Sequence, residues 1–269
     1  MTRINGSDVE HIAVTDRAIQ YGDGCFSTIL VESGRPKLWP LHQARFVKTL
    51  AALFIPEPDW RAVLLQVETF AADFVDKGVV KVLISRGSGG RGYSLTGCQS
   101  PSVVISHFPF PAHYHEWQHA GIQLGVCEQV LGLSPMLAGF KHLNRLEQVL
   151  LKQEIESHQW LDAVVCDVQG HVVETSASNI FWRKDDTLYT PDLSMAGVCG
   201  VMREHVIGLI EDSPYCLEIV KSPLTALLCA DEVFITNALM ALVPIKKINE
   251  HSFTERTALN ELNKRLYSC

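Results

Sequence analysis

The sequence predicts an α/β protein of two domains in which most strands pair antiparallel. Short strand-like runs follow one another directly through tight turns, as antiparallel hairpins allow. Runs with helical spacing of apolar residues separate these strands. A proline-containing stretch, residues 108–113, interrupts both patterns and is typical of a linker. We therefore expect a smaller N-terminal domain over 1–108, a linker over 109–120 and a larger C-terminal domain over 121–269.

The expected elements follow from local signals in chain order. Turn residues Ser33-Gly34-Arg35-Pro36 predict a hairpin. Around and after it we expect strands at 25–32 and 37–39, helices at 41–53 and 60–74, and strands at 79–85 and 102–108. Beyond the linker we expect a strand at 121–128, a helix from 143, strands at 163–167, 171–174, 180–183 and 187–190, helices at 201–211 and 224–228, a strand at 232–236 and a C-terminal helix.

Charge and composition restrict the class of ligand. The net charge is −7 and the isoelectric point is near 5.9, which argues against nucleic-acid and anionic-membrane binding because both need clustered cations. A small molecule is the expected ligand. The N-terminus has no apolar signal core and no apolar run is long enough for a membrane span, so we expect a cytoplasmic protein. Eight cysteines without a C-x-x-C pair are expected to be small buried hydrophobes.

The run GSGGRG at 87–92 matches the glycine pattern of dinucleotide-binding loops. That pattern also needs a helix at its third glycine and an acidic residue about 20 positions later, and neither is expected here. A mobile loop whose Arg86 and Arg91 could meet a substrate carboxylate is the better interpretation.

The run His115-Glu116-Trp117-Gln118-His119 is a literal H-E-x-x-H. On a helix, this pattern can bind zinc. Prolines before it and Gly121 after it leave barely two helical turns, and no third ligand stands out. We expect a polar linker and no metal site.

Lys141 stands where helix physics disfavours a lysine. From Leu143 onwards apolar residues recur at helical spacing, which places Lys141 in or just before the first turn of an amphipathic helix. A helix start carries partial positive charge, and the preceding segment 135–140 is mostly apolar. Both effects lower the pKa of a lysine. Two interpretations stay open. Either Lys141 has no special role at a frayed helix end, or its amine is kept neutral so that it can react.

Three further features gain interest beside Lys141. Gly197 and Gly200 precede a predicted helix, whose unpaired N–H groups suit a phosphate. Arg45 shares a predicted helical face with His42, and Glu174 ends a predicted strand. Taken singly, the two glycines indicate a turn, Arg45 indicates a charge on the surface, and Glu174 indicates a carboxylate in contact with water. Together they match a pyridoxal-phosphate site, in which a lysine forms an imine, a helix start and an arginine hold the phosphate, and a carboxylate keeps the pyridine nitrogen protonated.

The motifs resemble fold-type IV pyridoxal-phosphate enzymes, the family of branched-chain and D-amino-acid transaminases and aminodeoxychorismate lyases. Glu174 follows Lys141 by 33 residues in V-V-E-T-S-A-S-N-I-F, and G-V-C-G-V-M-R and D-E-V-F-I-T-N-A-L-M-A-L-V-P-I come after it. The resemblance covers nearly the whole chain. It implies a two-domain α/β (α+β) fold of this type and a homodimer.

The resemblance also implies roles for individual residues. It makes Lys141 the imine-forming lysine, Glu174 the partner of the pyridine nitrogen and Arg45 a phosphate ligand. It adds four cofactor contacts: the backbone N–H groups of Val201 and Met202, and the pair Asn237 and Ala238. Transaminases often carry a hydroxyl on the second residue of that pair, and Ala238 has none.

Four segments resemble the lyase branch of the family most: D-R-A-I-Q-Y-G-D-G-C-F-S-T (16–28), S-R-G-S-G-G-R-G-Y-S (85–94), F-K-H-L-N-R-L-E-Q-V-L (140–150) and T-N-A-L-M (236–240). Branched-chain transaminases commonly continue F-E-G-I-R after the phenylalanine, where this chain has Ser27-Thr28-Ile29. Thr28 is therefore a candidate catalytic hydroxyl, and Arg91 and Tyr93 are candidate substrate ligands.

The implied reaction converts 4-amino-4-deoxychorismate to 4-aminobenzoate and pyruvate, a step toward folate. Two alternatives stay open. One is a branched-chain or D-amino-acid transaminase on the same scaffold, and the other is a non-catalytic small-molecule binding protein.

Overall fold

The computed structural model describes residues 2–9, 11–98 and 100–266. Over these residues the chain forms two compact units, which we call unit 1 (Met1–Pro111 with Phe140–Arg145) and unit 2 (Ala112–Gly139 with Leu146–Cys269). Each unit contains helices and a sheet. The predicted α/β class is confirmed.

The units differ from the predicted domains in two places. Residues 113–120, expected in a linker, form helix α4 (His113–Ala120), and Tyr114 and Trp117 of this helix pack on a core of unit 2. Residues 140–145, which include Lys141, cluster with unit 1, although the prediction put this lysine in the C-terminal domain. Both differences come from contacts between segments far apart in the sequence.

Unit 1 contains, over its described residues, a five-stranded antiparallel sheet in the order β1-β5-β4-β2-β3. Its elements in chain order are β1 (Thr2–Ile4), α1 (Arg17–Tyr21), β2 (Gly24–Glu32), β3 (Arg35–Pro36), α2 (Trp39–Ala52), α3 (Trp60–Ala71), β4 (Lys77–Ser85) and β5 (Ser102–Pro109). The prediction missed β1 and α1. It was also wrong about a strand at 37–39, because α2 already begins at Trp39 with proline in its first turn.

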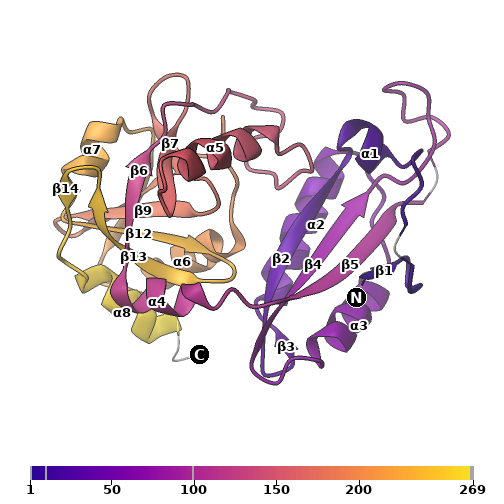
Figure 1. The fold of residues 1–269 in the computed structure, drawn as a ribbon, viewed down its shortest axis with the longest axis horizontal. Coiled ribbons are helices and arrows are strands. Elements are labelled where there is room, and N and C mark those ends of the chain that lie inside the picture. Colours follow the sequence, from indigo (N-terminus) through magenta and orange to yellow (C-terminus); the bar gives the residue numbers. More distant parts are fainter. Residues whose placement is uncertain (1, 10, 99, 267–269) are drawn as a thin grey trace. The chain divides into compact units, whose positions relative to one another are not determined.

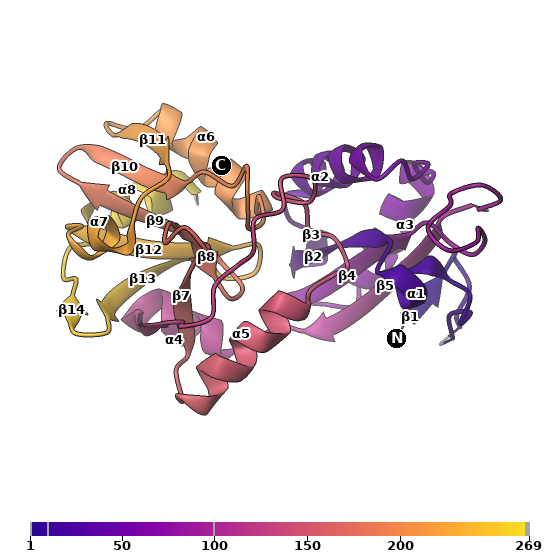
Figure 2. The same cartoon turned by 90° about the horizontal axis from the view of Figure 1, so that it is seen from above.

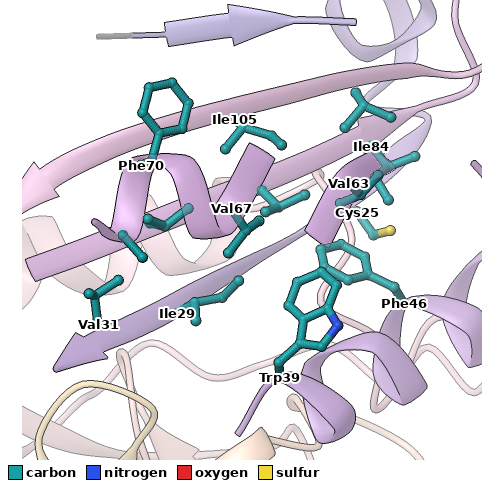
Figure 3. Close-up of a cluster of buried hydrophobic side chains, with 14 of the residues drawn as sticks. Cys25, Ile29, Val31, Trp39, Phe46, Val63, Val67, Phe70, Ile84 and Ile105 are labelled. Carbon is teal, nitrogen blue, oxygen red and sulfur yellow. The ribbon is translucent and has the colours of Figure 1, made fainter. Parts of the chain in front are cut away.

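The core of unit 1 lies between one face of this sheet and helices α2 and α3 (Figures 2 and 3). Ile29 of β2 packs there with Phe46 of α2 and Phe70 of α3. Because successive side chains of a strand point to opposite faces, Phe26 and Thr28 of β2 point to the other face, which we call the second face. Both are only partly buried, so this face can offer functional groups.

Unit 2 contains, over its described residues, a mixed sheet in the order β11-β10-β9-β12-β13-β6-β7-β8, with β14 paired to β13. Figures 1 and 2 together label these strands. Its elements are α4, β6 (Ile122–Val126), α5 (Leu146–Ser157), β7 (Asp162–Cys166), β8 (Val172–Thr175), β9 (Asn179–Lys184), β10 (Thr187–Pro191), α6 (Val201–Glu211), β11 (Cys216–Val220), α7 (Leu224–Leu228), β12 (Glu232–Asn237), β13 (Ala241–Ile248), β14 (His251–Ser252) and α8 (Thr257–Leu266). The prediction missed β11, β13 and β14.

Helices α6 and α7 have the predicted bounds, whereas α5 does not. Helix α5 begins at Leu146, later than predicted. Leu146, Val149 and Leu150 are 77%, 61% and 55% exposed, while Leu151 and Ile155 are buried. We expected Leu146, Val149, Leu150 and Ile155 to form the apolar face of this helix, and of these four only Ile155 is buried, so this prediction is mostly wrong.

Two features bear on the predicted cellular setting. No helix in the described part of the chain combines the length and apolar character that a membrane crossing needs. Among the cysteines, Cys216 and Cys229 are exposed, so the expectation of burial is wrong for them. Three cysteines are buried: Cys25, Cys127 and Cys166. Cys269 lies outside the described residues.

Candidate active site

Lys141 lies in a non-helical segment that pairs with β2. Its carbonyl accepts a hydrogen bond from the N–H of Phe26 at 3.0 Å, and the N–H of Leu143 donates to the carbonyl of Gly24 at 3.0 Å. The Lys141 carbonyl and the Leu143 N–H are thus paired with β2 and not with groups of a helix. Helix α5 starts only at Leu146. The prediction that Lys141 stands at a helix start is therefore wrong.

The amine of Lys141 lies over an aromatic ring on the second face of unit 1. Its Nζ is 4.7 Å from the centroid of the Phe26 ring, and the Nζ of Lys81 is 4.9 Å from the same centroid. Lys81 of β4 is paired in register with Thr28 of β2. Lys141, Lys81 and Thr28 thus gather around one side of the sheet. Sequence reasoning missed Lys81, although strand alternation beside buried Val80 and Val82 would have put it on this face.

The neighbour of Lys141 in the chain, His142, is neutral near pH 7. Burial, together with the positive charges of Arg145 and Lys141, lowers the pKa of His142 to about 4. Arg145 also donates hydrogen bonds to the carbonyls of Phe140 and His142. These contacts hold the segment that carries the lysine.

Arg45 is held by a buried serine and histidine. Its Nη2 donates to Ser27 Oγ at 2.5 Å, and Ser27 Oγ lies 2.5 Å from Nδ1 of His42. Burial, together with the charge of Arg45, keeps the pKa of His42 well below its usual range, so the imidazole is neutral. The predicted shared helical face of His42 and Arg45 is confirmed. Ser27 therefore anchors Arg45 to β2.

Glu174 of β8 is a buried carboxylate rather than a solvated strand end. Its side chain is 5% exposed, and its Oε2 accepts a hydrogen bond from the N–H of Val198 at 3.0 Å. Gly197 allows this approach, because a Cβ at this position would lie 2.6 Å from Val173 Cγ1 and 3.3 Å from the same carboxylate oxygen. A buried carboxylate is costly unless it is hydrogen-bonded, and it suits a partner that carries a proton.

The start of α6 has the features of an anion site. Gly200 is the N-cap residue and supplies no capping side chain to the first turn. Its N–H donates to Asn179 Oδ1, whose Nδ2 in turn donates to the carbonyl of Val198. The backbone N–H groups of Val201 and Met202 follow at the positive end of the helix, where a phosphate is favoured. Asn179, which sequence reasoning missed, fixes the approach to this helix.

Asn237 ends β12, and its side chain holds the turn at 238–240 that follows. Asn237 Oδ1 accepts hydrogen bonds from the N–H groups of Leu239 and Met240, both at 3.0 Å. Its Nδ2 donates to Ser178 Oγ at 3.3 Å. Since Ala238 carries no polar side chain, this pair offers a shaped backbone turn.

The glycine-rich segment 87–97 is a loop that carries exposed Arg91 and Tyr93. The residue before it behaves differently. Arg86 is buried and its Nε donates to Asp23 Oδ2 at 2.6 Å. The prediction that Arg86 could meet a substrate carboxylate is therefore wrong, while Arg91 stays a candidate.

The H-E-x-x-H run at 115–119 lies on α4, a helix of 8 residues. Within the described ranges, no group of three or more His, Cys, Asp and Glu side chains is arranged to hold a metal ion.

The candidate residues fall into two sets. Those in unit 1 are Lys141, Thr28, Arg45, Arg91 and Tyr93, and those in unit 2 are Glu174, Val201, Met202, Asn237 and Ala238. Within unit 1, Lys141 and Thr28 share the second face. Within unit 2, Glu174 and the start of α6 are joined through Val198, which is bonded to both Glu174 and Asn179.

Comparison with known proteins gives the family of the chain. The chain is 45% identical to the aminodeoxychorismate lyase of Vibrio harveyi over 98% of its own length and 97% of the relative. It is 26% identical to the D-alanine aminotransferase of Bacillus licheniformis over 88% of this chain and 83% of that protein. The crystal structure of 4-amino-4-deoxychorismate lyase from Pseudomonas aeruginosa superimposes with a TM-score of 0.93 at 35% identity, covering 100% of this chain and 98% of that one. The amino-transferase class IV model matches residues 24–248, and the protein therefore belongs to this family.

Proposed function

We propose that the protein is a pyridoxal-phosphate-dependent lyase that converts 4-amino-4-deoxychorismate to 4-aminobenzoate and pyruvate. The observation that carries this proposal is the 45% identity to an aminodeoxychorismate lyase across 98% of the chain and 97% of the relative. Such coverage extends to every candidate residue in both units.

The residues present fit the cofactor. Glu174 is a buried carboxylate suited to a protonated pyridine nitrogen, and the start of α6 has backbone N–H groups suited to a phosphate. In unit 1, Lys141 supplies a primary amine and Arg45 a guanidinium group on a buried anchor. We propose Lys141, Arg45 and Glu174, the N–H groups of Val201 and Met202, and the pair Asn237 and Ala238 as the cofactor contacts.

The bound cofactor supplies an aldehyde that combines with amines and a ring that accepts electrons. Lys141 would hold the cofactor through its aldehyde, and its amine would remove the proton from the amine-bearing carbon of the substrate. Glu174 would hold a proton at the ring nitrogen. Thr28 Oγ donates a proton to the departing enolpyruvyl oxygen, whose loss leaves an aromatic ring in the product. Arg91 and Tyr93 bind the substrate carboxylates.

Products identify the reaction. With authentic 4-amino-4-deoxychorismate and no added 2-oxo acid, we expect 4-aminobenzoate and pyruvate in equal amounts over many turnovers, because elimination and release of the aromatic amine restore the active cofactor directly. Both products are measured in the same sample by chromatography and a coupled pyruvate assay.

Two results would favour the alternatives. Turnover that stops after one equivalent unless a 2-oxo acid is supplied would make the protein a transaminase. A purified protein without visible absorbance, or with absorbance that hydroxylamine leaves unchanged, would support a non-catalytic binding protein.

Thr28→Val tests the proposed proton donor. Valine keeps the shape of threonine and removes the hydroxyl, so elimination should slow by about 10²-fold or more, the range for a positioned acid. Cofactor absorbance should be unchanged. Steady-state kinetics of Thr28→Val, with Thr28→Ser as a variant that retains the hydroxyl, measure the effect. Normal elimination by the valine variant would remove Thr28 from the mechanism.

We further propose that the protein acts as a homodimer in the cytoplasm, as the family resemblance and the composition imply. Light scattering of the purified protein tests the dimer, and fractionation of cells tests the location.

A further inference from the structure

Two of the segments that resemble the lyase branch are interlocked in unit 1. The N–H of Arg17 donates to the carbonyl of Gly87 at 3.0 Å, and the N–H of Arg86 donates to the carbonyl of Asp23 at 3.0 Å. The segment at 16–28 is therefore bound to the start of the glycine-rich loop through its backbone.

The side chain of Arg17 extends this connection to the far part of the loop. Arg17 is buried, and its Nη1 donates to the carbonyl of Gly92 at 3.1 Å and to that of Ser94 at 3.4 Å. These two carbonyls flank Tyr93. The Arg17 guanidinium also lies 4.7 Å from the centroid of the Tyr21 ring, which is 5.5 Å from that of Tyr93. One buried side chain thus contacts the loop on both sides of an exposed tyrosine.

Arg17 is itself anchored by an ion-paired network. Its Nε donates to Asp23 Oδ2 at 2.8 Å, and the same carboxylate accepts two hydrogen bonds from Arg86. Arg86 also donates to the carbonyls of Leu53 and Phe54 just after α2. Burial opposes ionisation of Asp23, but the hydrogen bonds from Arg86 and Arg17 outweigh it and lower its pKa. The network therefore stays charged near pH 7.

Glycine at position 90 lets the loop close onto this guanidinium. Gly90 has φ of +76°, and a Cβ there would lie 2.4 Å from the carbonyl oxygen of Ser94 and 3.1 Å from Nη1 of Arg17. A side chain would press against both partners of the contact.

We infer that Arg17 is a positioning residue: it fixes loop 87–97 so that Arg91 and Tyr93 are presented to the carboxylates of the substrate. This inference rests on the proposed function, because it assigns the loop to binding of that substrate. The side-chain hydrogen bonds of Arg86 go to Asp23, Leu53 and Phe54 and not to loop 87–97. Arg86 therefore anchors the network, whereas Arg17 holds the loop.

The test uses the cofactor-loaded enzyme with Arg17→Lys. Lysine can pair with Asp23 but, as a single ammonium group, cannot also reach both loop carbonyls in the geometry of a guanidinium. We expect KM for 4-amino-4-deoxychorismate to rise about tenfold or more, with kcat within about twofold and unchanged cofactor absorbance. Trypsin should cut the native protein after Arg91 about tenfold faster, because the loop opens more often.

Two further variants separate positioning from general destabilisation. Arg86→Lys weakens the same network away from the loop and should lower the melting temperature while leaving KM near that of the wild type. Gly90→Ala disturbs the loop contact from the other side and should raise both KM and cleavage after Arg91, which also gives a test if Arg17→Lys does not fold. Arg17→Lys combined with Arg91→Ala should lose the new tryptic cut.

Several results would overturn the inference. An unchanged cleavage rate in Arg17→Lys and Gly90→Ala would show that Arg17 does not hold the loop. Faster cleavage with an unchanged KM would show that the loop does not bind substrate, and an equal KM rise in Arg86→Lys would make Arg17 merely structural. Failure of the proposed function is a separate result, since the wild-type enzyme would form no 4-aminobenzoate. That result would overturn the substrate role as well.

Discussion

Replacing Lys141 with alanine is expected to abolish both the visible absorbance of the cofactor-loaded protein and its turnover. The reason is chemical: alanine has no amine with which to bind the cofactor aldehyde or to move the substrate proton. Absorbance spectra after reconstitution and dialysis, together with product assays, measure both losses. Lys141→Arg should fail as well, because a guanidinium keeps the positive charge but is not a usable nucleophile at neutral pH.

Lys81 is the matched control for this variant, because its Nζ lies over the same Phe26 ring at nearly the same distance, 4.9 Å compared with 4.7 Å. Lys81→Ala should retain the visible absorbance. Borohydride reduction followed by peptide mapping should find the cofactor on the peptide that contains Lys141. Attachment to Lys81 or to another lysine would reject the assignment.

The second large effect is expected for Glu174→Gln, which should keep the cofactor bound but slow catalysis by several powers of ten. Each tenfold loss corresponds to about 1.4 kcal/mol of transition-state stabilisation. Glutamine can still accept the hydrogen bond from the N–H of Val198, so the loop before α6 should keep its shape. A neutral amide cannot stabilise a positive charge on the ring nitrogen. Single-turnover kinetics on a fully loaded variant measure the loss.

Glu154 provides a matched control in unit 2. It is also a buried carboxylate, and it accepts hydrogen bonds from the N–H groups of Glu128 and Gln129 at 2.6 and 3.1 Å. Glu154→Gln makes the same chemical change in a purely structural setting, so it should lower the melting temperature with little effect on kcat. Near-normal turnover in Glu174→Gln would reduce Glu174 to a similar structural role.

Local signals were sufficient for several elements. Helix α6 begins at Val201 and ends at Glu211 as predicted, because a glycine precedes a run of clear helical spacing. Strand β2 carries alternating side chains, and its core face follows from that alternation. By contrast, β13 (Ala241–Ile248) was missed. It lies between two neighbouring strands and is mostly buried, so its apolar run lacks the alternation that marks a half-exposed strand.

The chemical groups of the candidate site were recognisable from the sequence, since Lys141, Glu174, Arg45 and the glycines before α6 are distinguished by residue type and order. Their settings were not. The sequence could not indicate that Glu174 is buried, because burial depends on Gly197 and Val198 closing over it. Nor could it indicate the anchoring of Arg45, which comes from Ser27 on a different element.

What the sequence by itself determined was the family and those helices and strands that have local start and stop signals, and it proposed the candidate reactive groups. Only the tertiary structure decided that residues 140–145 pair with β2 instead of starting a helix, that Lys81 lies beside Lys141, and that Arg17 reaches across to the carbonyls of Gly92 and Ser94. The physical reason is the same in each case. These contacts join segments distant in sequence, and their hydrogen bonds and buried charges outweigh the weak local preferences that periodicity reports.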